Sequence, residues 1–116
     1  MSDRKFDLED RFVDFGALTV FFCATLHNDM PGQYYGNQLL RSAGSSALNF
    51  GEMQGTQSDR DFKNKATISL KELKESRMNL RILSKVNYGE SEKRGKLLDE
   101  VEQLIKIMAT IIKNKG

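Results

Sequence analysis

The chain has 116 residues, enough for one domain with one core, and 39% of them are hydrophobic while 29% are charged. That balance excludes a disordered tail and a membrane-embedded protein. The formal net charge of +2 is too small to identify a nucleic-acid partner by itself. A single proline beside nine glycines favours long helices over a fold with many turns. We therefore expect one domain over residues 1–116.

Cys23 is the only cysteine, which excludes an internal disulfide and a thiolate zinc site. The first residues, MSDRKFDLEDRF, lack the apolar core of a signal peptide. The longest uncharged apolar run, Phe15 to Leu26, has about half the length that a membrane span needs. We therefore expect a cytoplasmic protein that does not enter the membrane.

The first predicted helix runs from Leu8 to His27. Its core-facing residues recur every three or four positions; they are Leu8, Phe12, Phe15, Thr19, Phe22 and Leu26. The remaining faces are apolar as well, with Val13, Ala17, Val20, Phe21 and Ala24. A helix that is apolar nearly all round is buried nearly all round, and one small bundle rarely encloses its own helix so completely. The pattern therefore predicts a homo-oligomer.

The second predicted helix spans Gln33 to Met53 and follows Pro31, a residue suited to a helix start. We expect its core stripe to be Leu40, Ala43, Ala47 and Phe50. The third helix begins after Ser58, an N-cap residue that forms a capping-box-like pair with Asp61. Gly89 closes this helix. Its core stripe is Phe62, Ala66, Ser69, Leu73, Ser76, Leu80 and Leu83.

The fourth predicted helix spans Ser91 to Lys113. Its inward residues are Leu97, Leu98, Val101, Leu104, Ile105, Met108, Ile111 and Ile112. Connections of only a few residues make successive helices antiparallel. The sequence therefore predicts an all-α fold, an antiparallel up-down-up-down four-helix bundle.

The residues that common catalytic sites require are missing. A di-iron bundle needs Glu-x-x-His pairs on facing helices, but His27 is the only histidine and Ala24 stands three residues before it. A serine nucleophile needs a base held within hydrogen-bond reach, and the serines of the second helix lie on a plain helix face. No glycine-rich phosphate loop occurs. We therefore expect no enzyme, no metal site and no cofactor.

A motif series runs through the second and third helices: Gln-Leu, Arg-Ser, a further Ser, Asn-x-x-Glu, Ser-x-x-Asp-Phe and a Lys-Glu-rich stretch. These motifs fall on Gln38, Leu39, Arg41, Ser42, Ser45 (or Ser46), Asn49, Glu52, Ser58, Asp61, Phe62, Lys65, Lys71, Glu72 and Glu75. The series resembles that of the bacterial four-helix-bundle proteins encoded in 23S ribosomal RNA intervening sequences, over nearly the whole chain. The sequence departs from the family pattern at Arg77 and Met78, where the family often has Tyr-Trp.

This resemblance implies a homopentamer with a funnel or barrel shape. It also implies kinship with the accessory variability protein of diversity-generating retroelements, which binds a reverse transcriptase and nucleic acid. The expected partners are therefore further copies of the chain and a structured RNA, or a reverse transcriptase or other ribonucleoprotein. The resemblance implies no reaction.

Short and polar side chains fill the second helix from Arg41 to Glu52. The serines suit tight packing inside the bundle, with hydroxyls bonded to backbone carbonyls. We expect a polar network that sets helix register and subunit orientation, because buried charges are costly unless paired. Its predicted members are Arg41, Ser42, Ser45, Asn49, Glu52, Asp61, Lys65, Glu72 and Glu75. A substrate site made of the same residues is the alternative.

Positive charge gathers in the third helix. Residues 1–27 carry three Lys and Arg against five Asp and Glu, whereas residues 55–88 carry eight against four. The stripe Lys74, Arg77, Arg81 and Lys85 advances by three or four residues and shares one face, with Arg60 and Lys63 nearer the helix start. The stripe is either a solvated face or a surface that contacts phosphates.

Two functions remain open from the sequence. The first is a non-enzymatic oligomeric module that binds RNA or a ribonucleoprotein through the basic stripe. The alternative is a structural scaffold for protein–protein interaction that binds no nucleic acid. Salt-dependent RNA binding would separate the two.

Overall fold

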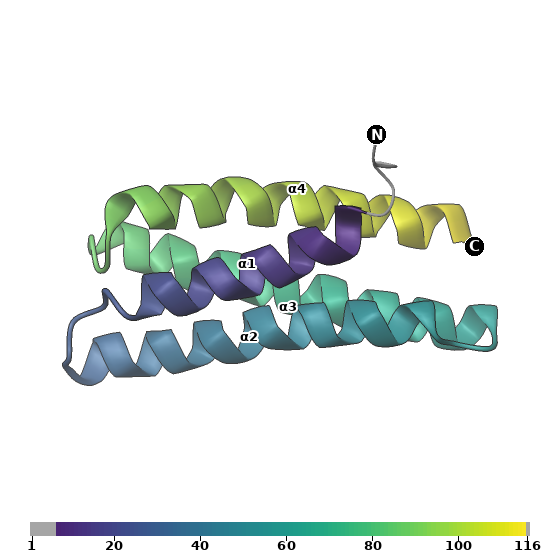
Figure 1. The fold of residues 1–116 in the computed structure, drawn as a ribbon, viewed down its shortest axis with the longest axis horizontal. Helices are drawn as coiled ribbons and strands as arrows, with labels where there is room; N and C mark the ends of the chain where they lie inside the picture. The colour runs from purple at the N-terminus through teal and green to yellow at the C-terminus, as the bar shows by residue number, and fades with distance from the viewer. Residues whose placement is uncertain (1–6, 116) are drawn as a thin grey trace.

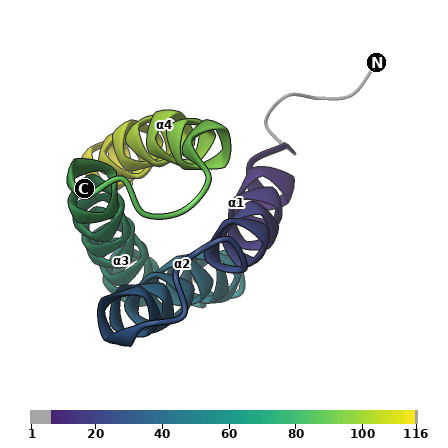
Figure 2. The same cartoon turned by 90° about the vertical axis from the view of Figure 1, so that its left-hand side faces the viewer.

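The computed structural model describes residues 7–115 as four helices that pack side by side (Figure 1). The helices are α1 (Asp7–Cys23), α2 (Met30–Gln54), α3 (Asp59–Lys85) and α4 (Ser91–Lys115). Each runs antiparallel to the one before it, and the end view in Figure 2 shows them arranged around one core. The predicted all-α, up-down-up-down bundle is confirmed. No helix within residues 7–115 is both long and apolar enough to span a membrane.

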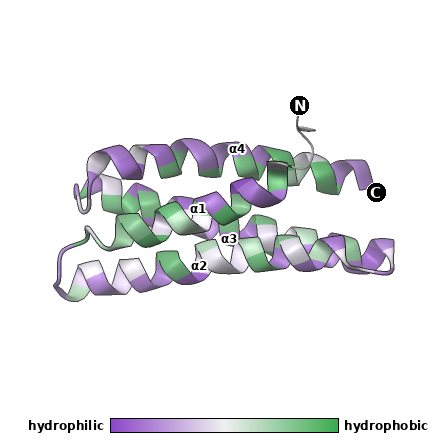
Figure 3. Ribbon diagram, viewed as in Figure 1, coloured by the Kyte–Doolittle hydropathy of each residue, from purple (hydrophilic) through white to green (hydrophobic). Residues whose placement is uncertain are grey.

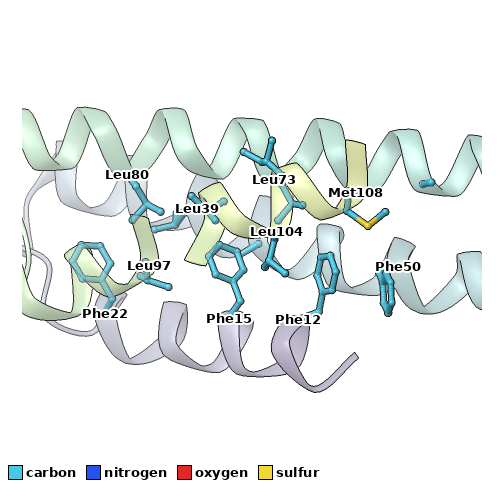
Figure 4. Close-up of a cluster of buried hydrophobic side chains, with 14 of the residues drawn as sticks. Phe12, Phe15, Phe22, Leu39, Phe50, Leu73, Leu80, Leu97, Leu104 and Met108 are labelled. Atoms are coloured by element: carbon cyan, nitrogen blue, oxygen red, sulfur yellow. The ribbon is translucent and has the colours of Figure 1, made fainter. Parts of the chain in front are cut away.

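The interior is built from one stripe of each helix. Phe12, Phe15 and Phe22 of α1 point into the bundle toward leucines of the other helices (Figure 4). The rings of Phe12 and Phe50 stack with their centroids 4.6 Å apart, which ties α1 to α2. The predicted core residues of α3 are buried, apart from the half-buried Phe62. Those of α4 are likewise buried or half-buried.

The predicted core stripe of α2 is wrong by one position at its start. Leu39 is fully buried, whereas Leu40 remains 38% exposed. The inward stripe runs through Leu39, Ala43, Ser46, Phe50 and Met53. Ser46 takes the inward place that was predicted for Ala47, which is half-buried, and its hydroxyl donates to the Ala43 carbonyl.

Three helix ends also differ from the prediction. α1 ends at Cys23, four residues before His27. α2 begins at Met30, three residues before Gln33, because Asp29 is its N-cap: the Asp29 Oδ1 accepts a hydrogen bond of 2.8 Å from the Gly32 N–H. The Ser58 cap of α3 is confirmed, since its side chain accepts from the Asp61 N–H. α3 ends at Lys85, and Gly89 lies in the following turn with φ of 81°.

One face of α1 is exposed in the single chain. The half of α1 next to the α1–α2 connection is largely hydrophobic in colour in Figure 3. Val13, Val20 and Phe21 are 57% to 63% exposed. An oligomer was expected because the first helix is apolar on nearly every face, and these exposed side chains agree with that reason. The homopentamer itself stays a prediction.

Candidate nucleic-acid interface

Serines join α2 to α3 in the centre of the bundle. The Oγ atoms of Ser42 and Ser76 lie 2.7 Å apart, and the Ser69 hydroxyl donates to the Ser46 carbonyl over 2.8 Å. All four side chains are fully buried. Small side chains at these positions therefore let the two helices approach closely while their polar atoms remain bonded. Ser69 and Ser76 were predicted as core residues of α3 and not as members of the polar network.

Charged residues line the edge of the same contact. Arg41 lies between two carboxylates of α3, with Nη1 3.6 Å from Glu72 Oε1 and Nη2 3.0 Å from Glu75 Oε1. Farther along, Lys65 Nζ lies 2.6 Å from Glu52 Oε1. Glu72 is buried and its Oε1 has no hydrogen-bond partner among the described residues, so Arg41 supplies its counter-charge.

The structure thus places most predicted network residues along one seam. Asn49 donates to the carbonyl and the hydroxyl of Ser45 within α2. Asp61 lies at the exposed start of α3, where its backbone N–H bonds to Ser58. Of the charged residues in these ion pairs, only Glu72 is buried, and the predicted role of the network in setting helix register and subunit orientation stays a prediction.

The basic stripe of α3 divides into two parts. Lys74, Arg81 and Lys85 are exposed. Arg77 is half-buried instead, and its Nη1 donates to Glu102 Oε1 on α4 over 3.1 Å. Arg77 therefore belongs to the contact between α3 and α4. Its position in the sequence could not reveal that Glu102 is its partner.

The other cations of this stripe have no counter-charge within the described part of the chain. Within residues 7–115, neither Lys74 nor Arg81 nor Lys85 lies within 4.0 Å of a carboxylate of another described residue, and the same holds for the exposed Arg60 and Lys63. An ion pair does form beside them, between Lys71 Nζ and Glu75 Oε2 at 4.0 Å. The free cations could each meet a phosphate oxygen without breaking a bond of the fold.

Two hollows lie along the same helix. One of about 540 Å³ is lined by Thr67, Leu70, Lys71, Lys74, Glu75 and Met78. The second, of about 500 Å³, is lined by Thr56, Asp61, Asn64, Lys65, Thr67 and Ile68, so the two meet at Thr67. Met78 is 55% exposed. The outward surface of α3 therefore combines apolar and basic side chains.

A second polar cluster ties the two loops together at one end of the bundle. The Tyr88 hydroxyl donates to Asp29 Oδ2 over 2.8 Å, and the His27 ring stacks on the Tyr88 ring at 4.2 Å. Arg94 Nη1 donates to the Tyr88 carbonyl over 2.7 Å. The Gly32 N–H, and next the Tyr88 hydroxyl, hold the pKa of Asp29 below its usual value. This cluster anchors the connections between helices, and sequence spacing did not reveal it.

The comparisons with known proteins decide the family. A model of the 23S rRNA-intervening sequence proteins matches residues 20–110. The chain belongs to this family. A crystal structure of a protein of unknown function from the S23 ribosomal protein family of Bacteroides thetaiotaomicron is also similar, with 30% identity and a TM-score of 0.80. The similarity covers 90% of this chain and 97% of that one.

The resemblance in the sequence is thereby confirmed. A comparison with curated proteins found no match. The residues matched by the family include the α2–α3 seam and the basic stripe of α3. Within residues 7–115, no group of three or more His, Cys, Asp or Glu side chains is placed to hold a metal ion.

Proposed function

We propose that this chain is a non-enzymatic binding module that contacts RNA through the outward face of α3. The observation that carries the proposal is the set of exposed α3 cations that form no ion pair within the described chain: Arg60, Lys63, Lys74, Arg81 and Lys85. Lysine and arginine on one face neutralise phosphates and release counterions.

The proposed binding positions an RNA backbone and does not read bases. The proposed contact surface is one side of α3 that carries Arg60, Lys63, Lys74, Arg81 and Lys85, and contacts between such charges and phosphates carry little sequence information. In a homo-oligomer the same face would recur around the symmetry axis, so that several weak contacts act on one RNA. A cytoplasmic location, as the sequence predicts, would place the module with its ligand.

The test replaces two cations that lie outside the internal ion pairs. Arg81→Glu with Lys85→Glu should weaken binding of a labelled RNA hairpin at low salt by about 10-fold or more, because two phosphate contacts become repulsive. Fluorescence anisotropy across a salt series measures both affinity and salt dependence. Arg77 is a poor choice for the test, because its replacement would also break the pair with Glu102.

The matched control is Lys106→Glu with Lys113→Glu, which makes the same charge change on two exposed α4 residues. It should retain most of the affinity. Equal losses in both double variants would show that binding follows net charge alone and would refute a defined face on α3.

The alternative is a protein-interaction scaffold without RNA binding. The specific observation in its favour is the apolar part of the α3 surface, where Leu70 and Met78 line a hollow. If the wild-type chain binds no RNA even at low salt, this second function replaces the first.

A further inference from the structure

The exposed cations of α3 form three pairs at a regular spacing. The pairs are Arg60 with Lys63, Lys71 with Lys74, and Arg81 with Lys85. Lys63 and Lys74 stand 11 positions apart, as do Lys74 and Lys85. Because 11 residues make almost three whole turns of an α-helix, the pairs lie on one side of α3. At a rise of about 1.5 Å per residue, neighbouring pairs are centred about 16 Å apart and the whole row is roughly 38 Å long.

This side of α3 faces away from the rest of the described chain. α3 packs against α2 and α4, and in the end view of Figure 2 it lies at the edge of the bundle between them. All six cations are exposed. Of the six, only Lys71 has a carboxylate within 4.0 Å among residues 7–115, that of Glu75, and an ion pair at an exposed site contributes little. The row is therefore open along its whole length.

The gaps between the pairs carry no free cation. The two other cations of α3, Lys65 and Arg77, are held in ion pairs by Glu52 and Glu102. Each gap is about 10 to 12 Å long at the same rise per residue. Surfaces that bind a single strand follow its backbone with positive charge, because every nucleotide carries a phosphate. A single RNA strand along this row would therefore place phosphates opposite uncharged stretches.

α3 also offers no platform on which single-stranded bases could stack. Its one aromatic residue is Phe62, which is half-buried, and Lys115 Nζ lies 4.6 Å from the centre of its ring. Proteins that bind single strands combine a basic groove with aromatic side chains that stack on the bases. Unpaired bases would find no such partner on this side of α3. Both the charge spacing and the composition thus disfavour a single strand.

A double helix presents its phosphates in a pattern that suits the row. Its two backbones wind around one axis, so a straight line along its surface crosses a backbone, then a groove, then the other backbone. The first gap of the row carries Asn64 and Thr67, which are exposed and stand four positions after Arg60 and Lys63. Amide and hydroxyl groups can bond to 2′-hydroxyls, which the wide and shallow minor groove of A-form RNA displays and DNA lacks.

We propose that the ligand of α3 is an A-form RNA duplex, such as the stem of a hairpin, with the three cation pairs on three successive backbone crossings. The first gap then lies over the minor groove, where Asn64 and Thr67 reach 2′-hydroxyls. The second gap, at Met78, spans the narrow major groove, whose base edges side chains do not read. The inference rests on the proposed RNA binding and narrows the ligand from RNA in general to one shape.

The test compares three labelled ligands by fluorescence anisotropy at low salt. They are an RNA duplex of about 16 base pairs, the length that a double-stranded-RNA-binding domain spans, the DNA duplex of the same sequence, and a uridine strand with as many phosphates as the duplex. The RNA duplex should bind about 10-fold or more tightly than the uridine strand, because the single strand lacks the grooves that match the gaps. It should bind about 3-fold or more tightly than the DNA duplex, because DNA lacks 2′-hydroxyls.

The failures of the two proposals are distinguishable. A uridine strand that binds as tightly as the RNA duplex overturns the duplex assignment and leaves RNA binding by α3 intact. A DNA duplex that binds as tightly as the RNA duplex overturns the assignment to the A-form. Absence of binding to both RNA ligands refutes the proposed function itself, and the present inference with it.

An exchange of two side chains tests the spacing at constant net charge. Lys71→Met with Met78→Lys keeps the composition and moves one cation by seven positions, so the middle pair shifts by about 5 Å along α3. Both positions are exposed, and circular dichroism should show wild-type helicity. Affinity for the RNA duplex should fall about 3-fold or more, because one pair no longer meets a backbone, while affinity for the uridine strand should not change. An unchanged affinity for the duplex contradicts the match of pairs to backbone crossings.

Thr67→Val tests the contact with the minor groove, because it removes a hydroxyl and keeps the shape of the side chain. Affinity for the RNA duplex should fall about 3-fold, and affinity for the DNA duplex should stay the same, since DNA has no 2′-hydroxyl to lose as a partner. Equal effects on the two duplexes, or no effect on either, contradict the placement of the first gap over the minor groove.

Discussion

The hydroxyl groups of Ser42 on α2 and Ser76 on α3 lie 2.7 Å apart, fully buried between the two helices. Each hydroxyl also has a carbonyl of its own helix within reach, at Leu39 for Ser42 and at Glu72 for Ser76. The pair therefore connects two backbones through short side chains. Larger apolar residues at either position would push the helices apart, and larger polar ones would lack partners.

We expect the two serines to be energetically coupled. Ser42→Ala or Ser76→Ala should each lower the free energy of unfolding by about 1 kcal/mol, the usual net value of a buried hydrogen bond. The double variant should lose about 0.5 to 1 kcal/mol less than the sum, because the shared bond can be lost only once. Urea unfolding measures all four proteins. Ser84→Ala, at an exposed position of α3, is the control and should change little, and additive losses at the buried pair would contradict the coupling.

Two helix glycines should respond oppositely to alanine. A Cβ atom at Gly95 would meet nothing within 4 Å, so Gly95→Ala should stabilise α4 by about 0.5 to 1 kcal/mol. A Cβ atom at Gly32 would collide with the His27 backbone carbonyl, so Gly32→Ala should destabilise the fold. Thermal unfolding of the two variants checks both signs. If Gly32→Ala instead stabilised the fold, the backbone of the α1–α2 connection would have to move away from the added methyl group at little cost in free energy.

Asp29 should make stability depend on pH at the acid end. Its pKa in the folded chain lies below the ordinary value of 3.8, because the Gly32 N–H and the Tyr88 hydroxyl bond to the carboxylate. The stabilisation is therefore fully present above the unfolded pKa and is lost as the pH falls through the folded one. Asn at this position still caps a helix but does not titrate, so Asp29→Asn should flatten the decline of melting temperature between about pH 5 and 2.

Glu90 contributes to the same decline, because the Lys93 N–H lowers the pKa of its carboxyl. Glu90→Gln therefore serves as the comparison and should remove a separate part of the slope. If Asp29→Asn keeps the full wild-type slope, the Tyr88 and Gly32 bonds do not hold in solution.

The Cys23 thiol should be unreactive in the folded chain. Burial raises its pKa from 9.0 to about 11, since the thiolate would lose water contacts. At pH 8 the thiolate fraction should be about 100-fold lower than in the unfolded chain, and alkylation by iodoacetamide should slow accordingly. Mass spectrometry of timed samples gives the rate, and the same reaction in concentrated guanidinium chloride gives the reference. Equal rates in both conditions would contradict the burial of this thiol.

The amino-acid sequence by itself determined the four helices, the core stripes of α3 and α4, the Ser58 cap and the family. The helices, their core stripes and the cap are local features. Side chains three or four residues apart share one helix face, and a cap acts within one turn. The sequence also showed the acidic first helix and the basic third helix. It also predicted Arg41, Glu72 and Glu75 as members of one polar network; these three form ion pairs between α2 and α3, and the assembly role of that network stays a prediction.

Only the tertiary structure decided which residues meet across the bundle. Periodicity defines a helix face to within about one residue, so it could not tell Leu39 from Leu40 as the buried leucine of α2. Arg77 and Glu102 stand 25 positions apart, and packing of α3 on α4 makes them partners. The apolar residues of α1 looked alike in sequence, yet packing against α2 and α4 buries Phe12, Phe15 and Phe22 and leaves Val13, Val20 and Phe21 exposed. These outcomes depend on how far each helix is rotated about its axis and how far apart neighbouring helices lie. Packing of the whole core sets both quantities, and the spacing of residues within one helix does not encode them.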